Sequence, residues 1–89
     1  MPITPEAIRE RILAALPGAA VDVRDTTGGG DHFAALVIAA GFEGKSLVDR
    51  HRAVYAALGE AMHADVHALA LDTFTPAERD KLKKEIRTP

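Results

Sequence analysis

Residues 32–72, HFAALVIAAGFEGKSLVDRHRAVYAALGEAMHADVHALALD, decide the fold. The run over 32–40 is almost continuously apolar, which predicts a buried strand. Alternate residues over 65–72 form two sets that would lie on opposite faces of a strand, so this stretch predicts another strand. The turn at 41–44 and the helical pattern after it form a crossover that is long enough to bring these two strands parallel in one sheet.

The helix of this crossover has one apolar face. Ser46 is its expected N-cap, and Asp49, three residues on, resembles the acidic member of a capping box. Gly59 either weakens the last turns of the helix or marks a break in it. The residues expected on the shared face are Leu47, His51, Val54, Tyr55, Leu58 and Met62.

The segment before residue 32 supplies a helix and a further strand. The Thr-Pro pair at 4–5 predicts a helix start, and the Pro-Gly pair at 17–18 predicts its end. Residues 20–25 alternate between apolar and charged side chains, as in a half-buried strand. The loop over 26–31 holds three consecutive glycines, so we expect it to connect two antiparallel strands.

The C-terminal segment predicts a third helix. Thr75-Pro76-Ala77-Glu78 reads as a complete capping box with Pro at the first helical position, and a charged helix follows toward Arg87. The element order is therefore αββαβα. We expect an α/β (α+β) fold in which a three-stranded mixed sheet is packed by helices, in a single domain over residues 1–89.

Composition narrows the class of protein. The chain has 89 residues, of which 47% are hydrophobic and 27% charged, the balance of a globular domain. No apolar run approaches the roughly 20 residues that span a bilayer, and the first ten residues lack the pattern of a secretory signal, so we expect a cytoplasmic protein. The absence of cysteine excludes disulfides and thiolate ligands from this chain.

Catalytic motifs are missing from the sequence, which contains neither GxSxG nor HExxH, so we expect a protein that is not an enzyme. His67 is either hydrogen-bonded at the edge of the core or a metal ligand. Because parallel neighbouring strands begin at the same edge of a sheet, His32 could approach His67 and share a metal with it. A structural role or plain exposure fits His32 equally well. We expect His51 to be packed and hydrogen-bonded, and His63 only to suit the helix dipole.

Two glycine-rich segments are candidate binding loops. Residues 28–30 lie between strands and open no helix, which argues against a phosphate-binding loop. Residues 41–44 read GxxG, the pattern with which KH domains clamp a nucleic-acid backbone, although Glu43 and a net charge of −2 oppose strong binding. The residues that would contact nucleic acid are Gly41, Gly44, Lys45, Arg50 and Arg52.

Several motifs together resemble the BolA family in order and spacing. They are Phe42-Glu43-Gly44-Lys45-Ser46-Leu47, Arg50-His51-Arg52, Val54-Tyr55 with Leu58, and Val66-His67-Ala68-Leu69-Ala70-Leu71, with Asp25-Thr26-Thr27 and His32-Phe33 before them. The likeness extends from Ile8 to Pro76. It implies a BolA-like fold similar to class II KH domains, in agreement with the order predicted from caps and periodicity.

The resemblance also implies a function. BolA-like proteins are partners of monothiol glutaredoxins, with which they share a [2Fe-2S] cluster used in iron regulation or cluster delivery; the glutaredoxin and glutathione supply the thiolates. On this side the implied ligands are His67 and a second residue, for which His32 is the best match and Asp31 or no ligand the alternatives. We expect no cofactor in the isolated protein, which would be a monomer or weak homodimer. The family's link to transcription implies DNA binding as the alternative function.

Overall fold

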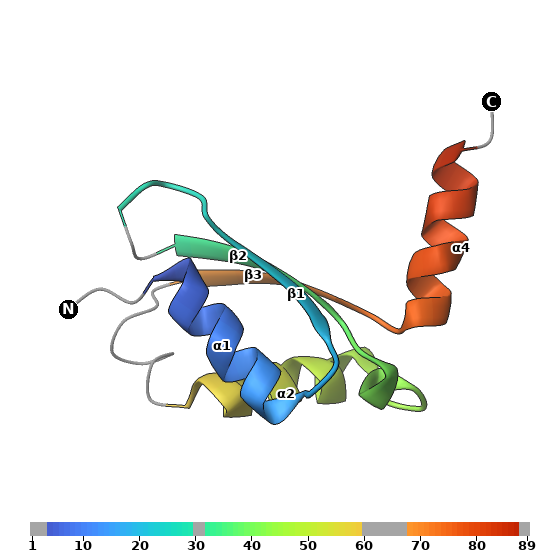
Figure 1. Ribbon diagram of the computed structural model, residues 1–89, viewed down its shortest axis with the longest axis horizontal. Coiled ribbons are helices and arrows are strands. Elements are labelled where there is room, and N and C mark those ends of the chain that lie inside the picture. Colours follow the sequence, from blue (N-terminus) through green and yellow to red (C-terminus); the bar gives the residue numbers. More distant parts are fainter. Residues whose placement is uncertain (1–3, 30–31, 60–67, 88–89) are drawn as a thin grey trace.

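The computed structural model describes residues 4–29, 32–59 and 68–87, and the predicted order αββαβα is confirmed (Figure 1). A short 3₁₀ turn lies between the second strand and the central helix. The elements are α1 (Pro5–Ala15), β1 (Ala20–Asp25), β2 (His32–Ile38), η1 (Ala40–Phe42), α2 (Leu47–Leu58), β3 (Ala68–Phe74) and α4 (Pro76–Arg87). No helix within these ranges is both long and apolar enough to cross a membrane.

The three strands form one mixed sheet in the order β1-β2-β3, as predicted. β1 pairs antiparallel with β2, and β2 pairs parallel with β3. The parallel register joins His32 to Ala68 at one end of the sheet and Ile38 to Phe74 at the other. The crossover through α2 therefore brings the starts of β2 and β3 to the same end of the sheet.

Local caps start the helices where the sequence predicts. The Oγ1 atom of Thr4 accepts a hydrogen bond from the backbone N–H of Ala7 at 3.1 Å, and the Oγ atom of Ser46 accepts one from Asp49 at 3.2 Å. Each bond satisfies a backbone donor that the first turn of a helix leaves without a partner. These short-range contacts fix the first turns of α1 and α2 before any packing is considered.

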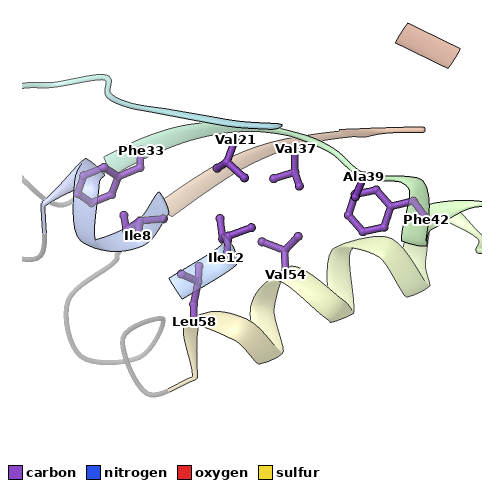
Figure 2. Close-up of a cluster of buried hydrophobic side chains, with 9 residues drawn as sticks. All are labelled: Ile8, Ile12, Val21, Phe33, Val37, Ala39, Phe42, Val54 and Leu58. Atoms are coloured by element: carbon purple, nitrogen blue, oxygen red, sulfur yellow. The ribbon is translucent and has the colours of Figure 1, made fainter. Parts of the chain in front are cut away.

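Helices α1 and α2 lie on one face of the sheet (Figure 1), and the hydrophobic core lies between them and the sheet (Figure 2). α1 contributes its i, i+4 pair of isoleucines and α2 its i, i+4 pair of apolar residues, so each helix buries one narrow stripe. The buried cluster consists of Ile8, Ile12, Val21, Phe33, Val37, Ala39, Phe42, Val54 and Leu58.

The central helix differs from the prediction in its length and in part of its apolar face. α2 ends at Leu58 because Gly59 adopts a positive φ of 57°, so the predicted break is the alternative that holds. Leu47 and Tyr55 do not lie in the core, since they are 60% and 39% exposed. Phe42, fully buried from η1, fills the core at the start of α2 instead. Met62 lies outside the described residues.

The strand limits shift by a few residues. β2 ends at Ile38, two residues before the predicted end, because the chain turns into η1 at Ala40. β3 continues to Phe74, beyond the predicted end at residue 72, because its parallel partner runs on to Ile38. The predicted start of this strand at residues 65–67 lies outside the described residues.

The sequence predicts a sheet that is packed by helices, and α1 and α2 pack on it as predicted, whereas α4 does not. This helix projects from the end of β3 instead of lying against the sheet (Figure 1). The sheet face opposite α1 and α2 therefore carries no helix within the described ranges. A hollow of about 320 Å³ opens on that face, lined by Asp22, Arg24, Ala34, Ala35, Leu36, Asp72, Phe74 and Arg79.

Candidate functional site

His32 lies at the end of the sheet where β2 and β3 begin. It is the first residue of β2, it is exposed, and its register partner is Ala68, the first residue of β3. In the sequence Ala68 directly follows His67. The second predicted ligand, His67, and the alternative ligand, Asp31, both lie outside the described residues. The described geometry thus places one of the candidate ligands and the strand that follows the other.

Hydrogen bonds fix the backbone at His32. Its carbonyl oxygen accepts from the N–H of Thr26 at 3.0 Å and from the Oγ1–H of the same residue at 3.2 Å. The Oδ1 atom of Asp25 accepts from the N–H groups of Thr27 and Gly28 at 3.2 and 2.9 Å, which folds the chain after β1 into a side-chain turn. The bonds from Thr26 and those to Asp25 hold the end of the hairpin directly beside the candidate ligand.

Packing holds the next residue of β2. Phe33 is 2% exposed and belongs to the buried cluster under the sheet. Because successive side chains of a strand point to opposite faces, the buried ring of Phe33 turns the side chain of His32 toward the uncovered face. Burial at one position therefore determines the direction of the candidate ligand at the previous one.

The metal-ligating side chains of this protein can be compared with the ligands of the iron–sulfur cluster that the resemblance implies. Among the residues that the structure describes, no three His, Asp or Glu side chains gather into a metal-binding group. Iron–sulfur clusters accept imidazole in place of thiolate at one iron, as in Rieske centres. An exposed histidine at the end of the sheet therefore fits a cluster whose other ligands come from outside the described residues. It does not fit a metal site built from the described residues alone.

The candidate nucleic-acid residues lie in the turn between β2 and α2 and on α2 itself. Gly41 lies in η1, and Gly44 adopts a φ of 77°, a left-handed conformation that favours glycine. The N–H of Lys45 donates to the carbonyl of Phe42 at 3.0 Å, which closes the turn. Both glycines are exposed, as are Lys45 and Arg52. Lys45 therefore directly follows an exposed turn, and Arg52 lies further along, within α2.

Arg50, the third candidate cation, is bound within the protein. Its Nη1 and Nη2 atoms donate to the two carboxylate oxygens of Glu78 at 2.7 and 3.2 Å, and its Nε atom donates to the carbonyl of Lys45 at 3.1 Å. The guanidinium also lies 5.9 Å from the centre of the Phe42 ring. The Arg50 side chain is only 12% exposed, so it ties α2, the turn and α4 together and offers little to a phosphate.

Glu78 has two partners of different origin. The predicted capping box is present: Glu78 accepts from the N–H of Thr75 at 2.9 Å, and the N–H of Glu78 donates to the Oγ1 atom of Thr75 at 3.1 Å. The hydrogen bond from Arg50, with the bond from Thr75, lowers the pKa of Glu78 to about 2. Sequence analysis identified the cap but missed the ion pair, which joins residues 28 positions apart.

The pair predicts an acid-dependent loss of stability. The folded-state pKa of Glu78 is about 2, below its ordinary value of 4.5, so the ionic contribution is complete above the ordinary value and fades as the pH falls toward the lower one. We expect Glu78→Gln, which keeps the capping acceptor, to unfold more readily than the wild type at neutral pH. Urea unfolding over a pH series checks this, because the difference should vanish in acid. A difference that is independent of pH would contradict the ionic role.

The remaining histidines have less to offer. His51 packs edge-on against Tyr55, with ring centres 6.4 Å apart. The packing was predicted; the expected hydrogen bond is not found for its buried Nε2 atom within the described part of the chain. His63 lies outside the described residues.

Comparison with known proteins assigns the family. A sequence model described as BolA-like protein matches residues 13–78. BolA-like protein 1 of Homo sapiens is 39% identical over 79 residues, covering 81% of this chain and 58% of the human protein. The DNA-binding transcriptional regulator BolA of Escherichia coli (strain K12) is 32% identical over 88 residues, covering 91% of this chain and 84% of that protein.

A solved structure agrees with the fold. The bolA protein homologue from Coxiella burnetii superposes with a TM-score of 0.75 at 39% sequence identity, covering 88% of this chain and 97% of that chain. The fold is thus that of a small α/β protein with a mixed three-stranded sheet. The chain belongs to the BolA family, and the resemblance seen in its motifs is confirmed. It spans 58% of the length of the human relative.

Proposed function

We propose that this protein is a non-enzymatic adaptor that binds a monothiol glutaredoxin and shares a [2Fe-2S] cluster with it, in iron–sulfur cluster trafficking or iron regulation. One observation carries the proposal: the exposed His32 begins β2 in register with Ala68, the residue that directly follows His67 in the sequence. Membership of the BolA family supports the proposal, and the partner class and cluster type are those that the motif resemblance implies.

In this proposal the ligands come from two proteins. The glutaredoxin cysteine and a glutathione supply thiolates, while His67 supplies an imidazole nitrogen and His32 is the first choice for the second ligand, with Asp31 as the alternative. Imidazole is a neutral ligand, and its use in place of thiolate raises the reduction potential of a [2Fe-2S] centre. A cluster held between two proteins and partly by imidazole suits transfer or sensing better than storage.

The scaffold suits this role because it presents a ligand without enclosing it. The bonds from Thr26 fix the backbone of His32, and the buried ring of Phe33 sets its direction. His32 is exposed at the end of the sheet where β2 begins, where a partner could reach it. The chain alone provides no thiolate, so we expect the isolated protein to hold no cluster.

A spectroscopic titration tests the proposal. Monothiol glutaredoxin loaded with its cluster is titrated with the protein, and the visible circular dichroism is followed. We expect a new spectrum that saturates at one protein per cluster, because exchange of a ligand changes the asymmetry around the iron. An unchanged spectrum with no complex by size-exclusion chromatography would reject the partnership. A complex that forms without any spectral change would reject only the ligand role.

DNA binding is the second candidate function, favoured by the exposed Lys45 directly after the turn at 41–44 and by the exposed Arg52 on α2. A relative from Escherichia coli carries the name of a DNA-binding transcriptional regulator. Because Arg50 is bound to Glu78, phosphate contacts would fall to the other two cations. Titration of duplex DNA at two salt concentrations tests this: replacing Lys45 or Arg52 by Ala should weaken binding and flatten its salt dependence. Absence of binding at physiological salt would reject it.

A further inference from the structure

We propose that the outer edge of β3 pairs antiparallel with the same edge of a second copy of this chain, about a two-fold axis at Leu71, so that the two sheets become one. β3 is the last strand in the order β1-β2-β3, with a strand neighbour on one side only among the described residues. The inference rests on this edge and is independent of the proposed function.

The direction of the backbone groups at this edge follows from one hydrogen bond. The N–H of Ala39 donates to the carbonyl of Phe74 at 3.0 Å, so the backbone groups of Phe74 face β2. Successive residues of a strand direct these groups to opposite sides. The N–H and C=O groups of Leu69, Leu71 and Thr73 therefore face outward, on the side away from β2.

The sequence leaves this edge open to pairing. Natural edge strands are commonly protected by Lys, Pro, a bulge or several charges. β3 reads ALALDTF, with a single charged residue and no Pro, Lys or Gly. The opposite edge strand, β1, reads AVDVRD and carries three charged residues in six. Of the two edges of the sheet, β3 is the one suited to accept another strand.

The edge is complementary to itself in one register. With Leu71 opposite Leu71 of the second copy, each Leu69 faces a Thr73, and the three outward residues of each strand form about six backbone hydrogen bonds. On the uncovered face Asp72 then lies opposite Ala70 of the second copy. The two carboxylates do not face each other across the strands, which avoids the repulsion that directly opposed like charges cause.

The structure leaves room beside this edge. A groove of about 400 Å³ lies between the end of β3 and α4, lined by Thr73, Phe74, Glu78, Lys81 and Leu82. In the proposed register Leu69 of the second copy reaches the residue Thr73 at this groove, where its side chain can cover Leu82. α4 begins beyond the end of β3 and projects away from the sheet (Figure 1).

Charge substitutions at Ala70 test the register. Ala70 is exposed, and its replacement changes what Asp72 of the second copy faces. We expect Ala70→Asp to weaken self-association about three- to tenfold and Ala70→Lys to strengthen it by a similar factor, since each contact occurs twice. Ala20→Asp places the same charge on the exposed first residue of β1 and should leave self-association unchanged. Sedimentation equilibrium up to millimolar concentration measures all four proteins.

Cross-linking tests the pairing directly, because the chain has no cysteine of its own. Residues opposite each other without mutual hydrogen bonds have Cα atoms about 4.5 Å apart, within the range of a disulfide. An oxidised mixture of Ala70→Cys and Asp72→Cys should give mainly the mixed dimer, more than either variant gives with itself. Wild-type protein that stays monomeric at every concentration would overturn the proposal. So would a dimer that ignores the charge at residue 70 and shows no preference for the mixed disulfide.

Discussion

Replacing Phe33 by Ala is expected to lower the free energy of unfolding by about 3–5 kcal/mol, because it leaves a cavity the size of a phenyl ring in a close-packed core. Phe33 is 2% exposed and lies in the cluster that joins the sheet to α1 and α2 (Figure 2). Small domains are stable by only about 5–15 kcal/mol, so this loss is a large part of the total. Urea unfolding followed by far-ultraviolet circular dichroism measures it.

The matched control is Leu36→Ala, three residues along the same strand on the uncovered face. Leu36 is half-buried on the sheet face that α1 and α2 leave uncovered, so we expect a cost of about 1 kcal/mol from lost apolar contact without a closed cavity. A Phe33→Ala variant that costs no more than this control would contradict the placement of the core. Because residue 33 follows His32, the Phe33→Ala variant should also loosen the start of β2, seen as faster exchange of the backbone amide at position 33.

Replacing His67 by Ala is expected to abolish the change in the visible spectrum when the protein meets cluster-loaded glutaredoxin. Loss of groups that only support a ligand commonly weakens metal binding by about 10–100-fold, and loss of the ligand itself should cost at least as much. His32→Ala should have a smaller effect if Asp31 can replace it as a ligand. Visible circular dichroism measures these differences when wild type, His67→Ala and His32→Ala are titrated under the same conditions.

His63→Ala is the control for that series, because it removes an imidazole four positions earlier in the sequence. We expect its titration to match the wild type. Far-ultraviolet spectra of all variants show whether each has folded. A folded His67→Ala variant with the wild-type visible spectrum would contradict the assignment of that residue as a ligand.

Most of the fold could be predicted because it is encoded in short-range patterns. The caps at Thr4, Ser46 and Thr75 each use a residue within three positions of the backbone group that it satisfies, so they are legible in the sequence. The parallel pairing of β2 and β3 follows from the length of the crossover between them. These elements needed no knowledge of tertiary contacts.

The features that the sequence did not reveal depend on contacts between distant residues. Nothing local indicates that Arg50 pairs with Glu78, so a cation expected to meet phosphate proved to be bound within the protein. Phe42 and Leu47 are both apolar, and only the packed structure shows that the first fills the core and the second is exposed. The same holds for α4, whose N-terminal capping box was predicted correctly but whose position away from the sheet was not predicted.

The central claim is that the glutaredoxin binds at the end of the sheet where β2 and β3 begin. Amide chemical shifts of the isotope-labelled protein, recorded while unlabelled apo-glutaredoxin is added, test it directly. The largest changes should fall on Thr26, His32 and Ala68 and their neighbours, with Lys45 and Arg52 unaffected. Changes confined to the turn at 41–44 and to α4, with the amides of His32 and Ala68 unmoved, would contradict it.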